Sequence, residues 1–420
     1  MTIEARPMPL DAAAVAGLSE RRNEPAWLRE LRRSWWDRAD ATPWPTGQEE
    51  EWRRTSLKDL PRDGALVEDA EFRPEIPDVR LADRGVIFTD LATAVDEHAE
   101  ILRRHLGAAE PVASHAAFWS LSLAAWTGGT FLYVPAGVEV DGTLIARMTQ
   151  PTPSGTFLPH SLVVAEEGSS VTLLEETVSP DGAPGWFGGT VAIHAGPGSR
   201  VRYANLQRLG DGIWNVGAQR VEVGRDASVT SLNTEVGSRV TKLGLDVQMT
   251  GKGGTSLLLG LLAAGNDQHI DINTLQDLVA DHTTSDLLYL SALYERARAA
   301  FYGVTRVQET ARQSSSYQEC RNLLLSPNAG AEPIPVLEIK TNDLLRCGHG
   351  ATAGAIDPVQ LFYAQTRGLE ADEAERMIVR GFFEQVIAKI PVEPVRSAML
   401  AALADRIGHA ELIEDPEAAA

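Results

Sequence analysis

The chain has 420 residues, 44% of them hydrophobic and 23% charged, which is the composition of a globular protein long enough to form two or three domains. Its formal net charge of −20 argues against a nucleic-acid-binding protein, because affinity for phosphates comes from Lys and Arg. Two cysteines in a chain of this length exclude a disulfide framework and favour a reducing compartment.

The sequence shows neither a secretory signal nor a membrane span. The N-terminus, Met-Thr-Ile-Glu-Ala-Arg-Pro, has no charged region followed by an apolar run. The longest uncharged run, residues 112–138, is long enough for a span, but Gly128, Gly129 and Pro135 interrupt it. We interpret this run as a helix end, a turn and a buried strand, and we expect a cytoplasmic protein.

Residues 1–110 are predicted to form a helical N-terminal domain. Apolar residues recur at helical spacing after residues 23–25, which predicts a helix that ends before Pro43. A second helix is predicted over residues 91–106, with Gly107 as its stop. Aromatic side chains bury large areas, so we expect core packing rather than a ligand platform for five tryptophans: Trp27, Trp35, Trp36, Trp44 and Trp52.

Residues 111–355 are predicted to form a domain of short strands. Runs of β-branched and apolar residues alternate with turns, and no pattern long enough for a crossover helix intervenes. Four similar turns open strands at nearly equal intervals; they begin at Gly168, Gly198, Asp226 and Gly253. A loose period of this kind with strand units is typical of a solenoid, so we favour a β-helix over a β-sandwich with regular turns.

In a solenoid, a residue lies nearly above the residue one period earlier. Cys347 follows Cys320 by the same interval that separates Gly253 from Asp226, so neighbouring coils could bring the two thiols together. Residues 326–330, Ser-Pro-Asn-Ala-Gly, interrupt the register between them. A Cα separation well above ~7 Å would contradict this hypothesis.

Residues 356–420 are predicted to form a helical C-terminal domain. Asp357-Pro358 is an N-cap followed by proline at the first helical position, and Gly368 ends that helix. Residues 370–389 carry an apolar stripe at helical spacing, and a third helix is predicted over residues 395–407. Three short helices need to pack on the end of the solenoid or offer a face to a partner.

The stretch from residue 335 to residue 354 holds the main candidate site. Cys347 and His349 are two positions apart, so in an extended segment their side chains point to the same face. A thiol beside an imidazole can bind a soft metal or support thiol chemistry, and it can equally be an inert buried pair. The other candidate ligands are His269, Asp271 and His282, for which a structural role is the simpler interpretation.

Several catalytic motifs are absent from the sequence. It contains no Gly-x-x-x-x-Gly-Lys-[Ser/Thr] phosphate loop, Gly-x-Ser-x-Gly elbow, His-Glu-x-x-His or Cys-x-x-Cys. We therefore expect no ATP hydrolysis by the chain itself. Two cysteines cannot supply the four thiolates of a permanent iron–sulfur site, so any cluster would be transient, shared with another chain, or completed by imidazole and carboxylate.

A series of motifs follows in a fixed order in the second half of the chain. They are Thr-Ser-Asp-Leu-Leu-Tyr from Thr284, Ala-Arg-Ala-Ala-Phe-Tyr-Gly from Ala297, Tyr-Gln-Glu-Cys-Arg-Asn-Leu-Leu-Leu-Ser from Tyr317, Cys-Gly-His-Gly-Ala-Thr from Cys347, and Leu-Phe-Tyr from Leu361. Together these motifs resemble the SufB/SufD family of iron–sulfur cluster assembly proteins. The similarity is dense over residues 268–392. The Cys-x-His-Gly-Ala-Thr form and the chain length are more similar to the SufD branch than to the longer SufB branch.

The resemblance implies a mainly β fold, a right-handed parallel β-helix flanked by helical N-terminal and C-terminal domains. It also implies a non-catalytic scaffold subunit that pairs with a SufB-like paralogue through the β-helix and with SufC, an ABC-type ATPase, through the C-terminal helices. The family's ligand positions map to Cys347 and His349, which would hold a transient iron–sulfur cluster at the SufB interface, with His349 the better candidate. The candidate partner-binding residues are Leu361, Phe362, Tyr363, Arg367 and Phe382.

Two other interpretations stay open. The chain could be a SufB-type paralogue that carries the cluster itself, although the lack of further cysteines counts against it. It could also be a carbohydrate-active β-helix enzyme, but such enzymes need clustered catalytic residues and usually a secretory signal, and neither is evident. The sequence leaves open whether a flavin binds, whether a homodimer forms without the partner, and what Cys320 does.

Overall fold

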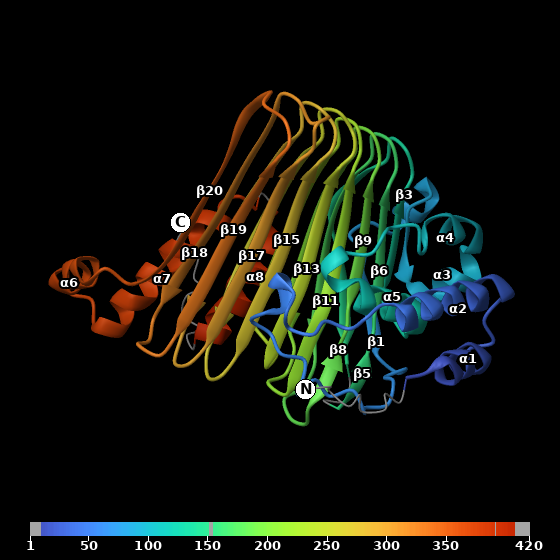
Figure 1. Ribbon diagram of the computed structural model, residues 1–420, viewed down its shortest axis with the longest axis horizontal. Coiled ribbons are helices and arrows are strands. Elements are labelled where there is room, and N and C mark those ends of the chain that lie inside the picture. Colours follow the sequence, from blue (N-terminus) through green and yellow to red (C-terminus); the bar gives the residue numbers. More distant parts are fainter. Residues whose placement is uncertain (1–9, 151–153, 391, 408–420) are drawn as a thin grey trace.

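A computed structural model describes residues 10–150, 154–390 and 392–407 of the chain (Figure 1). The chain is mainly β: a parallel β-solenoid occupies its centre, with helices before and after it. The N-terminal helices lie at one end of the solenoid in Figure 1, and strands β19 (Gly330–Ile339) and β20 (Leu344–Ala355) lie at the other.

The strands form two sheets that face each other and enclose the interior of the solenoid, here called the lumen. The nine-stranded sheet has the spatial order β1 (Glu71–Glu75), β4 (Glu139–Thr149), β7 (Ser170–Val178), β10 (Arg200–Arg208), β12 (Ser228–Glu235), β14 (Thr255–Ala264), β16 (Thr284–Leu293), β18 (Ser314–Leu324) and β20. The eleven-stranded sheet has the order β2 (Ile87–Asp90), β3 (Thr130–Val134), β6 (His160–Ala165), β9 (Thr190–Ala195), β11 (Ile213–Val223), β13 (Val240–Met249), β15 (His269–Leu278), β17 (Arg298–Val307) and β19. Two short strands complete it, β5 (Gly155–Phe157) and β8 (Gly185–Phe187).

The repeated turns of the sequence are corners of successive coils. The strands that they open pair in parallel and in register at Ser170, Arg200, Ser228 and Thr255. In each coil the turn residue two positions earlier has a left-handed backbone, with φ of 68° at Gly168 and 54° at Asp226. This conformation favours Gly and is tolerated by Asp. The β-helix interpretation is therefore confirmed, and the β-sandwich is wrong.

Side chains that point into the lumen form the main apolar core. Leu243, Ile272 and Phe301 are register neighbours on three successive strands of the eleven-stranded sheet. Across the lumen, the ring of Tyr289 on β16 lies 5.5 Å from that of Phe301. Ile272 and Phe301 are buried, and Leu243 is partly buried. A fully buried apolar side chain contributes about 1.5–3 kcal/mol, so the in-register stacks hold the coils together.

Part of the lumen is polar. Glu175 accepts hydrogen bonds from three hydroxyl groups, those of Thr130, Ser161 and Tyr203. Glu235 lies at the end of β12, where it contacts the amide groups of Asn205 and Asn215. Both carboxyl groups are buried, and their burial raises the pKa of each, to about 8 for Glu235.

The N-terminal helices pack on the first strands of the eleven-stranded sheet, from β2 to β11. They are α1 (Ala12–Arg21), α2 (Ala26–Ala41), α3 (Leu91–Glu97), α4 (Ala99–His105) and α5 (Ala116–Ala125). Helix α2 confirms the helix predicted after residue 25, and its Trp35 is buried in the core as expected. The single helix predicted over residues 91–106 is wrong, because the backbone breaks at His98. Leu91 of α3 and Leu102 of α4 both belong to one apolar cluster.

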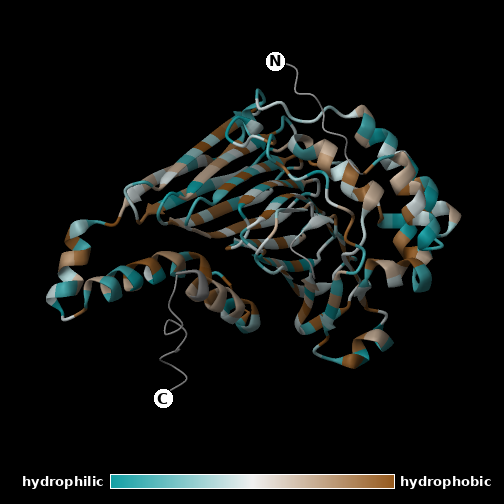
Figure 2. Ribbon diagram, turned by 90° about the horizontal axis from the view of Figure 1, so that it is seen from below, coloured by the Kyte–Doolittle hydropathy of each residue, from teal (hydrophilic) through white to brown (hydrophobic). Residues whose placement is uncertain are grey.

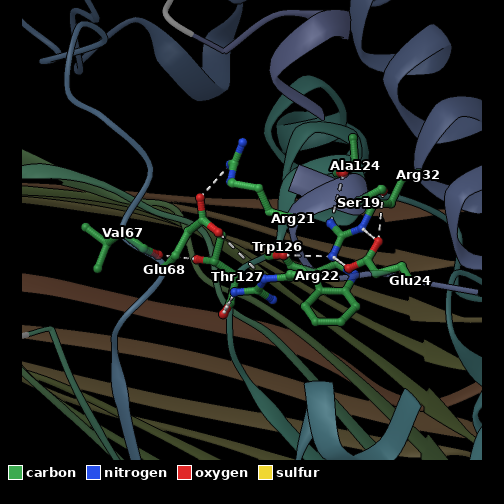
Figure 3. Close-up of polar contacts among 10 residues, drawn as sticks. All are labelled: Ser19, Arg21, Arg22, Glu24, Arg32, Val67, Glu68, Ala124, Trp126 and Thr127. Atoms are coloured by element: carbon green, nitrogen blue, oxygen red, sulfur yellow. Dashed lines mark hydrogen bonds and ion pairs between the residues drawn. The ribbon is translucent and has the colours of Figure 1, made fainter. Parts of the chain in front are cut away.

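A buried ion pair fixes these helices to the start of the solenoid (Figure 3). The guanidinium of Arg32 on α2 donates to both carboxylate oxygens of Glu24, each at 2.8 Å. It also donates to the carbonyl oxygens of Ala124 at 3.1 Å and Trp126 at 3.0 Å, in the segment that leads into β3. Because a buried charge is costly unless it is paired and hydrogen-bonded, these contacts hold α2 in one position.

The C-terminal helices are α6 (Pro358–Thr366), α7 (Ala371–Ile387) and α8 (Glu393–Ile407), which confirms the three predicted helices. Asp357 caps α6 by accepting a hydrogen bond from the backbone N–H of Val359. Apolar residues of α7 and α8, including Phe383, pack on the outward side chains of the nine-stranded sheet. In Figure 2 the helices near the C-terminus lie as a layer along one side of the strands. None of the helices in the described ranges is long and apolar enough to cross a membrane.

Candidate functional site at the open end of the solenoid

The two ends of the solenoid differ. At the N-terminal end the last strands are β1 and β2, short strands of five and four residues that pair antiparallel with β4 and β3. At the C-terminal end, β19 and β20 are the last strands of their sheets, and no described strand pairs with their outer edges. Unpaired strand edges of ten and twelve residues are templates for pairing with another chain.

Cys347 and His349 lie on β20, and their side chains face the mouth of the lumen, which is its open end between β19 and β20. Cys347 is the register neighbour of Ser316 on β18, and His349 is the register neighbour of Gln318. The two side chains therefore share one face, as their spacing predicted. Cys347 is partly buried against the luminal core, and this burial raises the pKa of its thiol. His349 is exposed, so the pair is packed on one side and open on the other.

Backbone groups of the same residues point to the open edge of β20. The carbonyl oxygen of Thr352 accepts a hydrogen bond from Asn322 Nδ2 at 2.9 Å, so it is directed at β18. Successive residues of a strand direct their N–H and C=O groups to opposite sides. The N–H and C=O groups of Cys347, His349 and Ala351 therefore face the free edge.

The open edge of β19 is less able to accept a strand. The N–H groups of Gly330 and Lys340 donate toward β17, to carbonyl oxygens at 3.1 and 2.9 Å. By the same alternation, the odd-numbered residues of β19 face the free edge, and among them Pro333 and Pro335 have no N–H to donate. Of the two open edges, β20 has the more complete set of hydrogen-bond donors.

The structure contradicts the hypothesis that Cys320 and Cys347 meet. The register neighbour of Cys320 is Ala351, four residues beyond Cys347. This offset corresponds to about 13 Å along the strand, well beyond the reach of a bridged pair. The prediction failed because the coils lengthen: the last coil is longer than the interval from Asp226 to Gly253, so Cys347 lies beside Ser316. Cys320 is 3% exposed, and its burial raises the pKa of its thiol to about 12.

Sequence reasoning missed a third residue at this end, Gln318. It lies on β18 beside His349, it is 0% exposed, and neither polar atom of its carboxamide has a hydrogen-bond partner. The available signal was that His349 follows it by one full coil, and this spacing becomes meaningful only once the register is known.

The other candidate ligands belong to a contact between the N-terminal segment and the solenoid. Thr55 Oγ1 lies 2.9 Å from His269 Nε2 and donates to Asp271 at 2.5 Å. Lys242, which is fully buried, pairs with Asp271 at 2.8 Å. His282 lies apart from them, in an exposed turn beside Asp281. Across the part of the chain that the structure describes, no group of three or more His, Cys, Asp and Glu side chains is arranged to hold a metal ion.

A second candidate surface lies on α6. Phe362 and Tyr363 are 67% and 59% exposed, and the guanidinium of Arg367 lies 5.1 Å from the Tyr363 ring centre and donates to its hydroxyl. Exposed apolar side chains gathered in this way mark interaction surfaces. The other two predicted partner-binding residues do not join this surface: Leu361 is partly buried, and Phe382 packs against the cluster beneath α7.

Comparison with known proteins identifies the family. Residues 147–382, from β4 to α7, match the family model described as SUF system FeS cluster assembly, SufBD core domain. The iron–sulfur cluster assembly protein SufD of Bacillus subtilis (strain 168) is 26% identical over 433 residues, which cover 95% of this chain and 98% of that protein. SufBD family proteins of iron–sulfur cluster assembly from Staphylococcus saprophyticus and Staphylococcus epidermidis are each 27% identical over 314 residues, covering 74% of this chain and 67% of theirs. The chain therefore belongs to the SufB/SufD family of the SUF system of iron–sulfur cluster assembly.

Proposed function

We propose that the chain is a SufD-type scaffold subunit that pairs with a SufB-type partner through the open end of the solenoid and supports cluster formation there. One observation carries this proposal: the candidate ligands coincide with the open edge. Cys347 and His349 direct their side chains to the mouth of the lumen and their backbone groups to the free edge of β20. A strand added to that edge would bring side chains of the partner next to the pair.

A site shared between two subunits suits a cluster that is cargo, that is, one assembled at the site and then passed on. A cluster held by four ligands needs more than the thiolate and imidazole that Cys347 and His349 offer, so the partner would supply the remainder. An incomplete set of ligands also allows the finished cluster to leave. In the isolated chain, burial raises the pKa of the Cys347 thiol. Metal binding would deprotonate this thiol, so Cys347 would become a thiolate ligand only when the metal is loaded.

The surface of α6 is the proposed docking site for an ABC-type ATPase. Phe362, Tyr363 and Arg367 project from a helix that adds little to the core, since Ala364 is its one buried residue. The chain has no phosphate loop, so any conformational change driven by ATP must come from another subunit. Such a subunit can shift the open end from one conformation to another only if it binds one of the two conformations more tightly.

The test is anaerobic co-purification of the full chain with SufB-type and SufC-type subunits from the same organism, followed by reconstitution with Fe²⁺ and sulfide. The wild-type chain should form a stable complex that acquires the visible absorption of an iron–sulfur cluster. His349→Ala should keep the complex intact on size-exclusion chromatography and form less cluster. His282→Ala, a matched change in an exposed turn, should behave as wild type.

Two results would contradict the proposal. Failure of the wild-type chain to co-purify with either subunit would overturn the assignment of its partners. Loss of the whole complex in His349→Ala would show that the histidine supports assembly of the subunits and not cluster formation.

A further inference from the structure

Gln318 is buried beside His349 with no hydrogen-bond partner. Other polar residues on the inward face of β18 are satisfied: Ser316 Oγ donates to the carbonyl oxygen of Ser285 at 2.7 Å, and Asn322 bonds both Ser291 and Thr352. Gln318 is 0% exposed, yet neither its Oε1 nor its Nε2 is bonded. A buried carboxamide in this state is costly and uncommon in native structures, so it calls for an explanation.

Gln276 shows how a structural glutamine is accommodated in the same lumen. It lies one coil further in, on β15, and is also 0% exposed. Its Nε2 donates to the carbonyl oxygen and the Oγ of Ser285 at 2.8 and 2.9 Å, and its Oε1 accepts from Thr305 at 3.1 Å. The same side chain, equally buried, is fully bonded inside the solenoid and unbonded next to the mouth. This difference points to a hydrogen-bond partner on the side of the mouth.

The carboxamide of Gln318 occupies the layer directly below the mouth. A Cβ on Gly303 of β17 would lie 2.1 Å from Gln318 Nε2, so the side chain crosses the lumen only because this residue is glycine. Pro335 is the register neighbour of Gly303 in the last coil, as His349 is of Gln318. The carboxamide therefore forms the floor of the space between Pro335 and His349.

We propose that Gln318 is the positioning residue for His349: in the complex with the SufB-type subunit, its carboxamide oxygen accepts the N–H of one ring nitrogen, and the other ring nitrogen faces the cargo. This inference rests on the proposed function, which makes His349 a ligand. Neighbouring strands lie ~4.8 Å apart, within the reach of a glutamine side chain. Histidines that bind metals generally donate their second N–H to such an acceptor, which fixes the tautomer and the ring orientation.

Co²⁺ titration of the complex between the full chain and the SufB-type subunit tests this role. A parallel titration of the His349→Ala complex isolates the affinity that depends on His349. Gln318→Leu is expected to lower this affinity by about 10- to 100-fold, the usual effect of removing such an acceptor. Gln318→Glu keeps an acceptor and should recover most of the affinity. Gln276→Leu, the matched control, should lower the unfolding midpoint and leave the affinity unchanged.

Histidine-selective ¹⁵N NMR of the same complexes gives a readout that a purely structural role would not change. His349 should be a single tautomer in the wild-type complex and a mixture of tautomers in Gln318→Leu. If Gln318→Leu does not fold, Gln318→Met makes the same comparison with a side chain of equal length.

The possible failures are distinguishable. If the wild-type complex shows Co²⁺ binding that depends on His349, and the Gln318 variants show the same affinity and the same single tautomer, the role of Gln318 is overturned and the proposed function stands. If the wild-type complex shows no binding that depends on His349, the proposed function is overturned together with this inference.

Discussion

Replacing Glu235 with glutamine is predicted to stabilise the solenoid at neutral pH. The Glu235 carboxyl group is buried in the lumen, with Asn205 Nδ2 and Asn215 Nδ2 each 3.2 Å from one of its oxygens. Its burial raises its pKa from 4.5 to about 8, and the hydrogen bond from Asn215 offsets only part of this shift. The folded chain therefore holds Glu235 neutral at pH 7, whereas the unfolded chain releases the proton.

The sign of the effect follows from proton linkage. Between pH 4.5 and pH 8 the folded state holds a proton on Glu235 that the unfolded state has lost, so the free energy of unfolding falls as the pH rises. The loss is at most about 1.4 kcal/mol per pH unit and reaches about 3 kcal/mol at pH 7. Glutamine has nearly the same shape and does not ionise, so Glu235→Gln removes this cost.

Urea unfolding at pH 5.5, 6.5 and 7.5 measures the effect. The stability advantage of Glu235→Gln over the wild type should grow by about 2–3 kcal/mol from the lowest to the highest of these pH values. The matched control is Glu139→Gln, at an exposed glutamate on β4 that lies 3.7 Å from Arg200, and it should show no such trend. An advantage that does not change with pH, or a loss of stability at pH 7.5, would refute the neutral state of Glu235.

Three further predictions test the described packing. Iodoacetamide at pH 8 should modify Cys347 and leave Cys320 intact, because Cys320 is buried and its pKa is raised to about 12; equal labelling in peptide mass spectrometry would contradict this. Arg32→Met should lower the free energy of unfolding in urea by about 3–5 kcal/mol, because it leaves a buried carboxylate unpaired, and a change below about 1 kcal/mol would show that the ion pair is dispensable. Phe383→Ala should cost about 3–5 kcal/mol, whereas exposed Phe362→Ala should cost less than about 0.5 kcal/mol and weaken ATPase binding in a pull-down assay; the reverse order would contradict the packing of α7.

The periodicity of the sequence predicted the solenoid because each coil needs a similar turn followed by a similar strand. A left-handed turn residue, Gly168 in one coil and Asp226 in another, precedes a strand two positions later, and this signal lies within a few residues. The shared face of Cys347 and His349 was predictable for the same reason, since it depends only on strand geometry. The break between α3 and α4 left no comparable signal, because His98 is neither Gly nor Pro.

Contacts between coils were not predictable, because they depend on the number of residues in each turn. The interval between the repeated turns suggested that Cys320 lies beside Cys347, but the last coil is longer by four residues and places Ser316 there. The same four residues bring Gln318 beside His349, which no local pattern indicates. The contact between Thr55 and Asp271 joins residues 216 positions apart and is equally invisible in the sequence.

Hydrogen–deuterium exchange of the full chain, with and without the SufB-type subunit, tests most directly whether the open end of the solenoid is the site of pairing. We predict that the backbone N–H groups of Cys347, His349 and Ala351 exchange rapidly in the isolated chain and become protected in the complex. Protection confined to the N-terminal helices or to α6, with these N–H groups of β20 still exchanging rapidly, would contradict pairing at this edge.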